Sequence, residues 1–592
     1  MKLKDWISPF YVWKRAFEKP FTVPKPLDER PGSSRYRGFH KNDLEKCIGC
    51  GTCSSICQNH AIDMVPVEGI ETTKGDSGLR PRIDYGRCCW CALCVDICPT
   101  TSLSMSNEYL WIDTDAEVFR FIPGAENKPW DNVQEGYTRE ESYHIVDPER
   151  VTMEMLPPDE RVKSFLEMVK GYSREQAQKE ADRCIQCGIC TATCPAHMDI
   201  PGYIKAVREN NIKDGLKLMY ETNPMPAMCG RVCTHQCEDV CALGHSGDPI
   251  SIRWLKRYLA DQVELDDYAK AMLVAIDSNG KHVAIIGAGP GGLSAAYYLR
   301  LLGYDITIYE AKDYAGGMTR YGIPEYRLPY DQLDKDISYI LSLGINIQYN
   351  TRVGEDITFE QVYTSFDAVL ISVGLLTPYK MEIPGEELPG NISGLEVLDM
   401  VTRGEKVYFG NRVAVIGGGN VAMDAARTAR TFGADVTLLY RRRIEDMPAD
   451  EEEIIDAEHE KVEFITQAIP LRIEQTEDNK LRFIFGLAEM VDQGDEKRPR
   501  PVLIEGKEHS IDVDMVISAI GQGADFSFLP MHYEALFSRR NQLKIDEFCR
   551  TNDPKIFAAG DIANKTKDAI SAIADGHRAA KTIDHMLQKE GI

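Results

Sequence analysis

An excess of positive charge, long apolar runs and an apolar leader are all missing from this sequence. Its 68 Lys and Arg residues are outnumbered by 92 Asp and Glu residues, which gives a net charge of −24. Such a chain has no surplus of cations to neutralise a phosphate backbone. No stretch approaches the roughly 20 consecutive apolar residues that cross a bilayer, and the start lacks an apolar core followed by a small-residue cleavage site. We therefore expect no nucleic-acid partner, no transmembrane segment and a cytoplasmic location.

The first 26 residues, "MKLKDWISPFYVWKRAFEKPFTVPKP", are basic and aromatic. Their prolines interrupt any long amphipathic helix, so the segment is a weak candidate for a membrane-surface helix. We expect residues 1–40 to form a docking arm on a partner subunit, with peripheral membrane contact as the alternative. The 592 residues leave room for about four domains of ordinary size.

Cysteine is abundant and unevenly placed. Sixteen of the eighteen cysteines fall in four bursts, and only Cys89 and Cys549 stand outside the spacing pattern. The bursts are Cys47, Cys50, Cys53 and Cys57; Cys88, Cys91, Cys94 and Cys98; Cys184, Cys187, Cys190 and Cys194; and Cys229, Cys233, Cys237 and Cys241. In a chain without a secretion signal this pattern predicts metal ligation rather than disulfides.

The first three bursts each have the spacing C-x2-C-x2-C-x3-C, which is the bacterial ferredoxin run. In that run three cysteines hold one [4Fe-4S] cluster and the fourth completes a neighbouring cluster. Zinc is the alternative, but four crowded thiolates per run exceed what a structural zinc site uses. The first two bursts thus predict two clusters. Their expected ligands are Cys47, Cys50, Cys53 and Cys98 for one, and Cys88, Cys91, Cys94 and Cys57 for the other.

This region of the chain resembles a known family. The stretches "RYRGFHKNDLEKCIGCGTCSSICQNHAI" and "RIDYGRCCWCALCVDICPTTSLSMS" are similar to the two-cluster ferredoxin-like subunit of respiratory complex I, over about residues 20–110. Gln58 replaces the proline usual after the fourth cysteine of the run. This departure affects a turn and removes no ligand.

The third and fourth bursts form a different pair, because the fourth has the spacing C-x3-C-x3-C-x3-C. Together with "PISIRWLKRYLAD", they resemble the helical iron-sulfur domain of the bacterial glutamate synthase small subunit. The same domain occurs in NADH-dependent ferredoxin:NADP reductase and in dihydropyrimidine dehydrogenase. The resemblance implies two more clusters. Their expected ligands are Cys184, Cys187, Cys190 and Cys241 for one, and Cys194, Cys233 and Cys237 with a fourth ligand for the other.

The fourth ligand of that last cluster stays open. In relatives it can be Gln or Glu from the helix that follows, but Lys256 falls there in this sequence, and an ammonium group has no lone pair to donate. Cys229 is the obvious substitute.

The stretch "KHVAIIGAGPGGLSAAYYLRLLGYDITIYEA" reads as a strand, a glycine turn, a helix and a second strand ending in an acid. Gly287, Gly289 and Gly292 form G-x-G-x-x-G, and Glu310 follows 18 residues after the last glycine. The glycines allow a tight turn, close approach of a pyrophosphate and close helix packing, and the acid binds a ribose hydroxyl. We predict a dinucleotide site suited to FAD.

A second such unit is "NRVAVIGGGNVAMDAARTARTFGADVTLLYRRR". Its cofactor-binding candidates are Gly417, Gly419, Asn420 and Ala422. Arg441 and Arg442 stand where the acid of the first unit stood, and guanidinium groups bind a 2′-phosphate that a carboxylate would repel. This predicts NADPH rather than NADH, with a solvated basic turn as the alternative.

Two further segments carry resemblances. "AGGMTRYGIPEYRLP", which includes Gly317 and Arg327, is similar to the loop after the second FAD strand of the glutamate synthase small subunit. "KIFAAGDIANKTKDAISAIADGHRAA" is similar to the closing FAD motif of disulfide-reductase-like flavoproteins. By that resemblance Asp561 binds the ribityl or pyrophosphate region of FAD.

The expected fold class is multidomain α+β and α/β. It combines a ferredoxin-like 2[4Fe-4S] domain, a helical iron-sulfur domain and two Rossmann-like domains of the disulfide-reductase type, the NADPH domain being inserted in the FAD domain. The expected boundaries are 1–40 arm, 41–110 ferredoxin domain, 111–160 linker, 161–275 helical iron-sulfur domain, 276–385 first half of the FAD domain, 386–515 NADPH domain and 516–592 second half of the FAD domain.

These domains predict an oxidoreductase subunit that passes electrons between NADP(H), FAD and four [4Fe-4S] clusters, to or from ferredoxin or other redox subunits of a larger complex. The direction of flow stays open, and electron bifurcation is an extension suggested by the resemblance to the ferredoxin:NADP reductase. One alternative is the small subunit of an NADPH-dependent glutamate synthase. The other is an electron-transfer scaffold without turnover of its own. Hydride transfer itself needs no general acid or base, so no catalytic side chain is predicted.

Overall fold

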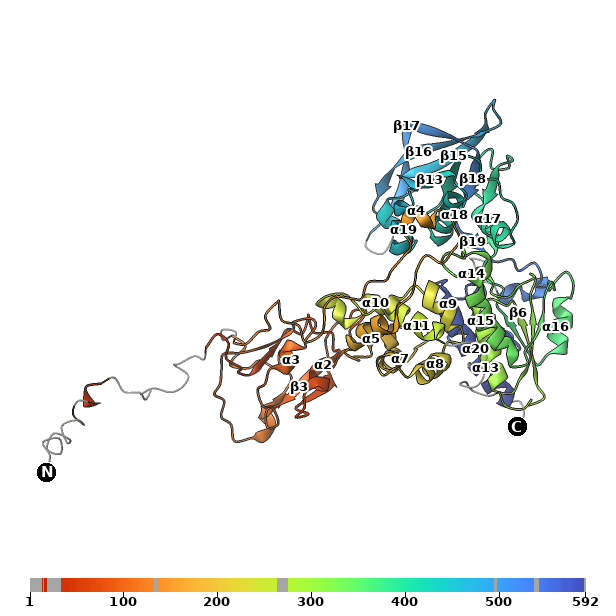
Figure 1. The fold of residues 1–592 in the computed structure, drawn as a ribbon. Coiled ribbons are helices and arrows are strands. Elements are labelled where there is room, and N and C mark those ends of the chain that lie inside the picture. The colour runs from red at the N-terminus through yellow and green to blue at the C-terminus, as the bar shows by residue number, and fades with distance from the viewer. Residues whose placement is uncertain are drawn as a thin grey trace. The chain divides into compact units, whose positions relative to one another are not determined.

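We analysed a computed structural model of the chain, which describes residues 13, 15–18, 33–132, 136–262, 275–494, 498–536 and 542–589. Most of the predicted docking arm therefore lies outside the described residues. The chain divides into two compact units. Unit 1 comprises residues 1–149, 185–190 and 240–249, and unit 2 comprises 150–184, 191–239 and 250–592. Figure 1 shows the elements of both.

Unit 1 holds two small antiparallel sheets. Strand β1 (His40–Asn42) pairs with β4 (Leu103–Met105), and β3 (Leu79–Asp84) lies between β2 (Ile62–Pro66) and β5 (Arg120–Phe121). The short helices α2 (Thr52–Ile56) and α3 (Leu93–Asp96) each follow the glycine- or alanine-containing turn of a cysteine burst. The remaining elements are η2 (Ala116–Phe119) and η3 (Ala242–His245).

The core of unit 1 is aromatic and surrounds the cysteines of both bursts. Phe39 stacks on Trp130 with ring centroids 4.2 Å apart, and both are almost fully buried. Phe121 and Trp130 belong to the segment that the sequence predicted to be a linker, yet they pack in the same cluster as Cys53, Cys94 and Cys98. Residues 120–130 thus help to bury the sulfur-rich centre of the unit.

Unit 2 begins with short helices. They are α4 (Pro158–Arg161), α5 (Arg174–Asp182), α7 (Ile200–Arg208), α8 (Ile212–Tyr220), α9 (Pro226–Val232), α10 (Gln236–Asp239) and α11 (Ile252–Asp261). Helix α6 (Ile189–Thr193) crosses the boundary between the units. Ser173 caps α5 through a capping box with Gln176. Helix α11 packs on α9 and α7, and Leu255 and Leu259 fill that contact without exposure to solvent.

Two parallel sheets follow, each with the order of a nucleotide-binding fold. The first has the order β20-β9-β6-β7-β8 and the second β11-β18-β12-β13-β14. The strands of the first are β6 (His282–Ile286), β7 (Asp305–Tyr309), β8 (Asn346–Gln348), β9 (Ala368–Ile371) and β20 (Ile556–Ala558); those of the second are β11 (Asn391–Ser393), β12 (Arg412–Ile416), β13 (Asp435–Tyr440), β14 (Glu463–Thr466) and β18 (Met515–Ser518). Buried apolar runs such as "VAII" and "VAVI" form the central strands, as expected for sheets covered on both faces.

Helices cover these sheets. The first sheet is flanked by α13 (Pro290–Leu301), α14 (Met318–Tyr321), α15 (Tyr330–Ser342), α16 (Phe359–Ser365) and α20 (Ala569–Lys589), and the second by α17 (Gly394–Thr402), α18 (Asn420–Thr431), η4 (Ile444–Asp446) and α19 (Glu451–His459). Helix α20 packs along α13, and both lie beside β6 in Figure 1. None of the helices within the described ranges is both long and apolar enough to span a bilayer.

The second sheet is an insertion in the first fold, as the sequence predicted. The chain leaves through β10 (Thr377–Pro378) and returns through β19 (Gln522–Gly523), and these two strands pair antiparallel. Strand β20, from the end of the chain, then joins the first sheet beside β9. The insertion also carries an antiparallel sheet of β15 (Ala468–Gln475), β16 (Leu481–Val491) and β17 (Arg500–Val513), and η5 (Met531–Leu536) follows it. The predicted fold class is confirmed.

Candidate functional site

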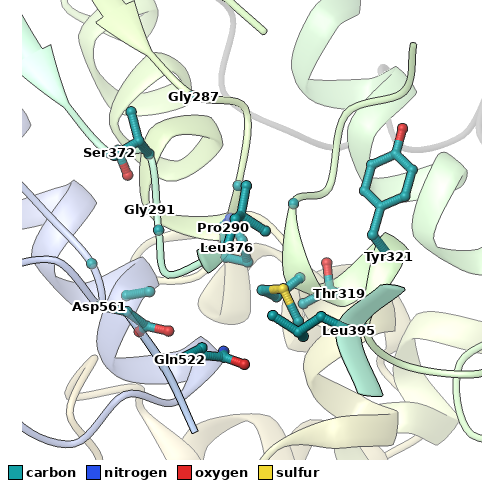
Figure 2. A pocket seen from close by; sticks show the side chains of 18 of the residues that line it. Gly287, Pro290, Gly291, Thr319, Tyr321, Ser372, Leu376, Leu395, Gln522 and Asp561 are labelled. Atoms are coloured by element: carbon teal, nitrogen blue, oxygen red, sulfur yellow. The ribbon is translucent and has the colours of Figure 1, made fainter. Parts of the chain in front are cut away.

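A cavity of about 1020 Å³ runs through unit 2 between the two nucleotide-binding folds. Figure 2 shows Gly287 and Ser372 in its upper part, Asp561 and Gln522 close together below them, and Thr319 and Leu395 to the right of that pair. Backbone from the first glycine fingerprint forms one wall, and the start of α18 contributes to another. One continuous space therefore touches both predicted nucleotide sites.

The first glycine turn is shaped as the sequence predicted. Gly287 has a φ of +103°, and a Cβ there would lie 2.5 Å from the carbonyl oxygen of Ser372. A Cβ on Gly292 would collide with the carbonyl of Gly287, so helix α13 packs tightly on the turn. Nothing lies within 4 Å of a Cβ built on Gly289, which lines the cavity. This open backbone cradle at a helix N-terminus fits a pyrophosphate.

Glu310 directly follows β7 and bonds to that turn. Its Oε2 accepts a hydrogen bond of 2.8 Å from the N–H of Ala288, and its Oε1 accepts one of 2.9 Å from the N–H of Lys312. Burial raises the pKa of the Glu310 carboxyl, and these backbone N–H groups oppose the rise. The carboxylate is thus held in place at the cavity wall, where it fits ribose hydroxyls.

The loop with Gly317 closes over the same turn. Gly317 has a φ of +55°, and a Cβ there would lie 3.0 Å from the Cα of Gly289. The N–H of Gly316 donates to the carbonyl of Ala288 at 2.8 Å. Asp561 lines the cavity from the other side, and burial, with Asp568 nearby, raises the pKa of its carboxyl to about 6. Both predicted residues lie at the cavity.

Arg327 also lines the cavity, but its guanidinium is committed to carboxylates of the inserted domain. Nη1 lies 2.7 Å from Asp424 and Nε lies 2.8 Å from Glu453. The structure therefore places Arg327 at the cavity wall, where it joins the two nucleotide-binding folds.

These ion pairs belong to a buried network that the sequence analysis missed. Arg427 of α18 donates to Glu453 at 2.6 Å and to Glu460 at 2.8 Å, and Arg161 of α4 donates to Asp456 at 2.7 Å. Burial opposes the charged form of Arg427, but Tyr326 and these carboxylates hold its pKa above the usual value. The pattern "DEEEIIDAEHE" marks an acidic helix, but nothing local reveals which distant arginines neutralise it.

The second glycine turn repeats the first. Gly417 has a φ of +147°, and a Cβ there would collide with the carbonyl of Ala519 and lie 3.3 Å from the Cβ of Ala422. Gly419 precedes the first turn of α18. Asn420 donates to Asp450 Oδ2 at 3.2 Å and accepts from the N–H of Asp450 at 2.9 Å, and both residues line the cavity.

The predicted 2′-phosphate residues follow β13. Arg441 is exposed, and Arg442 is partly buried with its Nε donating to the carbonyl of Pro499 at 2.9 Å. Arg443 is bound to Asp446 at 2.9 Å. Arg441 and Arg442 are not among the residues that line the cavity. They directly follow β13, the strand that comes after helix α18.

The cysteines of the first two bursts gather in two groups. Cys47, Cys50, Cys53 and Cys98 line one small cavity, which is the predicted first set. Burial raises the pKa of the Cys94 thiol, and Cys88, Cys91 and Cys57 raise it further. These three thiols therefore lie near Cys94. That is the predicted second set. Burial and the neighbouring thiols raise the pKa of Cys53 in the first group and of Cys88 and Cys94 in the second. The donor sets fit cationic iron clusters, whose charge replaces the protons.

The third burst falls partly in each unit. Of its cysteines, Cys187 and Cys190 belong to unit 1, whereas Cys184 and Cys194 belong to unit 2. Cys241 of the fourth burst also belongs to unit 1. Within unit 1, Ile48 and Cys50 pack with Ile185 and Cys187 against the buried residues Ile189, Val240 and Ala242. The first burst therefore lies next to the third.

Cys194, Cys229, Cys233 and Cys237 are all buried. Burial alone lowers the pKa of Lys256, but these four thiols outweigh it and raise the pKa above its usual value. Lys256 therefore lies near all four thiols, as the family resemblance implied. Cys229 is one helical turn before Cys233 on α9 and neighbours both Cys233 and Lys256.

Three further observations concern the cysteines. In the described portion of the chain, no group of three or more His, Cys, Asp or Glu side chains is arranged to hold a single metal ion. Cys549 is fully buried, and its thiol donates to the carbonyl of Asp575 at 3.6 Å. The segment around the fourth burst reaches the nucleotide cavity, because Val232, Thr234, Gln236 and Asp239 line it.

Comparison with known proteins follows the same division. The model of the pyridine nucleotide-disulphide oxidoreductase family matches residues 281–576. The model of dihydropyrimidine dehydrogenase domain II, with its 4Fe-4S cluster, matches residues 161–267, and that of the 4Fe-4S dicluster domain matches residues 46–102.

Three relatives are informative. The β subunit of NADP(+)-dependent formate dehydrogenase from Moorella thermoacetica is 39% identical, covering 68% of this chain and 60% of that one. The small chain of NADPH glutamate synthase from Escherichia coli is 32% identical over 75% of this chain and 99% of its own. The putative oxidoreductase AegA of Escherichia coli is 30% identical over 91% and 85%. The chain thus spans less than two thirds of the formate dehydrogenase subunit.

Proposed function

Since the chain belongs to the pyridine nucleotide-disulphide oxidoreductase family and is an iron-sulfur flavoprotein that uses NADP(H), FAD and [4Fe-4S] clusters, we propose that it is the NADPH-linked electron-transfer subunit of a larger redox complex. It exchanges electrons with NADP(H) at the unit 2 cavity and with a partner subunit through the cysteine bursts. FAD, when bound, links two-electron exchange with NADP(H) to one-electron exchange with the clusters.

One observation carries this proposal. The cavity touched by both glycine fingerprints is also lined by Val232, Thr234 and Gln236. Thr234 and Gln236 lie between Cys233 and Cys237 in the chain, and both cysteines are buried. The wall of the nucleotide cavity is therefore the same segment that would hold an iron-sulfur cluster. A short path between a flavin and a cluster follows from that shared wall.

The residues have separate tasks in this account. Gly287, Gly289 and Gly292 shape the FAD pyrophosphate turn, Glu310 holds ribose hydroxyls, and Asp561 faces the remainder of FAD. Gly417 and Gly419 shape the NADPH turn, while Arg441 and Arg442 pair with the 2′-phosphate.

We assign four clusters to the four bursts. The sets are Cys47, Cys50, Cys53 and Cys98; Cys57, Cys88, Cys91 and Cys94; Cys184, Cys187, Cys190 and Cys241; and Cys194, Cys233 and Cys237 with Cys229 as the fourth ligand. The small cavity around the first set and the grouping of thiols in the second support this assignment.

Cys50 and Cys187 pack against the same buried cluster in unit 1, which supports a way for electrons between the first and third bursts. The exposure of the cysteine side chains indicates which cluster exchanges electrons with the partner subunit. The cysteines assigned to the fourth cluster are all buried, whereas Cys91 of the second is exposed. We therefore place the exchange with the partner subunit at the second burst.

The partner belongs to the proposal as well. The relatives include a β subunit of a formate dehydrogenase and a small chain of a glutamate synthase, and a subunit of this design delivers electrons to, or takes them from, a separate catalytic chain or a ferredoxin. Glutamate synthase small chain is the second candidate, favoured by the match to 99% of that relative. Stimulation by glutamine and 2-oxoglutarate, only when a partner chain is added, would select it.

Electron bifurcation is a finer proposal that rests on the resemblance to NADH-dependent ferredoxin:NADP reductase. Its test is a flavin titration of the whole complex. Crossed one-electron potentials would support bifurcation, and ordinary, uncrossed potentials would refute it.

The main proposal is tested on the purified chain with an artificial dye. We expect rapid oxidation of NADPH coupled to dye reduction, and loss of that activity when Gly289→Val fills the open pyrophosphate cradle. A matched control is Gly404→Val, which should keep the activity, because a Cβ at Gly404 also meets nothing within 4 Å and Gly404 is not among the residues that line the cavity, although its φ of +70° adds backbone strain. A chain that binds NADPH but reduces no dye would instead be an electron-transfer scaffold.

A further inference from the structure

A buried histidine lies against one of the cysteine sulfurs of the second burst. His40 is 1% exposed, and its Nε2 is 3.2 Å from the Sγ of Cys94. A neutral imidazole carries its one proton on either nitrogen, and which one decides whether His40 donates to the sulfur or accepts from it.

Tyr85 decides that question. The backbone N–H of His40 donates to the Tyr85 hydroxyl oxygen at 2.8 Å, and His40 Nδ1 lies 3.0 Å from the same hydroxyl. A hydroxyl that accepts from the backbone can donate its own hydrogen to Nδ1. Nδ1 is then the acceptor and Nε2 carries the proton. A cysteine thiolate that binds iron has no hydrogen to give, so only this tautomer satisfies both ring nitrogens.

The backbone and the surrounding rings hold this arrangement. His40 opens β1 and pairs with Met105 of β4. The neighbouring Phe39 stacks on Trp130, and Tyr85 stacks on Phe121 with centroids 5.1 Å apart. The imidazole therefore has little freedom to leave the sulfur, and no water competes for it in a core of this kind.

We infer that His40 is a positioning residue that raises the reduction potential of the cluster held by Cys57, Cys88, Cys91 and Cys94, by donating an N–H···S hydrogen bond to Cys94. Reduction adds one negative charge to a cluster and its thiolates, and a donor aimed at a thiolate stabilises the reduced state more than the oxidised one. The inference rests on the proposed role of Cys94 as an iron ligand.

Other donors to this set come from the backbone. The N–H of Ala61 donates to Cys57 at 3.3 Å and the N–H of Trp90 donates to Cys88 at 3.4 Å. Hydroxyl groups serve the first set instead, with Thr52 3.2 Å from Cys50 and Ser102 3.4 Å from Cys98. His40 is thus a side-chain donor to the second set that a substitution can remove while the first set keeps its own.

The test is a redox titration of the full chain, purified anaerobically and followed by electron paramagnetic resonance. In His40→Phe we expect the affinity of one cluster for its electron to fall about tenfold, a downward shift of about 59 mV for a one-electron couple. The other clusters keep their potentials. His40→Gln, whose amide reaches toward the same sulfur, should show a smaller downward shift than His40→Phe. Tyr85→Phe, which frees Nδ1, should also lower the potential by less than His40→Phe does.

A second readout begins with the unaltered chain. Electron-nuclear double resonance on the reduced chain, labelled with ¹⁵N-histidine, should show a nitrogen coupling to one cluster that disappears in His40→Gln. Unchanged potentials in His40→Phe with full iron content, or no histidine coupling in the unaltered chain, would overturn the inference. If Cys94→Ser keeps all its iron and its signals, the ligand assignment itself fails, which is a separate result.

Discussion

At the scale of single residues, we propose that two arginines determine which nucleotide this chain prefers. Arg441 and Arg442 follow β13 at the position where the first fold has Glu310. Of the three consecutive arginines, Arg443 is already paired with Asp446 and Glu445, which leaves the other two to contact a 2′-phosphate. Hydrogen bonds to charged groups contribute about 1.5–3 kcal/mol each.

Arg441→Ala and Arg442→Ala should therefore each raise the KM for NADPH about tenfold or more, while the KM for NADH stays unchanged. Steady-state dye reduction with both nucleotides measures the effect. Arg443→Ala is the matched control and should leave both constants within about twofold. An equal loss with NADH would show that the arginines support the fold rather than the phosphate.

Asp561 gives the stability of the FAD fold a pH dependence. Its pKa in the folded chain is raised to about 6, so the folded state binds a proton more tightly than the unfolded state. The resulting stabilisation is complete below about pH 4 and is lost as the pH rises through about 6. Between about pH 5 and pH 7 the loss amounts to about 1 kcal/mol.

Asp561→Asn has no such proton to lose. We expect the thermal midpoint of the variant to rise relative to the unaltered chain between about pH 5 and pH 7, both stripped of FAD. Asp568→Asn, which removes the neighbouring charge, should weaken the pH dependence without abolishing it. A constant difference between variant and unaltered chain at all pH values would mean that Asp561 titrates normally.

Among the elements, α19 joins three regions of unit 2. Its carboxylates and the adjacent Glu460 receive Arg327 from the FAD fold, Arg427 from α18 and Arg161 from α4. The neighbouring Glu452 binds Arg253 of α11 at 2.6 Å. These pairs hold the inserted domain against the regions that carry FAD and iron.

Glu453→Gln should cost about 3 kcal/mol or more, because it leaves two buried guanidinium groups short of charge. It should also slow flavin reduction by NADPH more than it weakens NADPH binding, since the domain loses its fixed position. Differential scanning calorimetry and stopped-flow reduction measure the two effects. Asp435→Asn, which breaks the exposed pair with Arg430, should change neither by more than about 0.5 kcal/mol.

The sequence predicted the elements with a fixed local geometry and missed those defined by distant contacts. The glycine turns at Gly287 and Gly417 and the cysteine spacings follow from backbone and ligand geometry over a few residues, so a pattern reveals them. The burial of Phe121 and Trp130 in unit 1 was missed, because their segment is polar and lies outside the ferredoxin motif. The pairing of Arg327 with Asp424 was missed for the same reason, because the two residues are 97 positions apart in the chain.

At the level of the whole molecule, we propose that each unit carries a different stretch of the electron path. In unit 1, which holds the first two bursts, Cys50 and Cys187 pack against the same buried cluster. Unit 2 holds the nucleotide cavity, with Thr234 and Gln236 between Cys233 and Cys237 in its wall. This electron path makes one prediction that involves every domain. NADPH added at the cavity should reduce all four clusters.

The most direct test is an anaerobic measurement of iron and acid-labile sulfide per chain, on the same sample that is reduced by NADPH and by NADH in a stopped-flow spectrometer. The account predicts about sixteen irons, with flavin and cluster absorbance bleached much faster by NADPH than by NADH. Markedly fewer irons in a chain with full flavin, or clusters that stay oxidised while NADPH reduces the flavin, would contradict it.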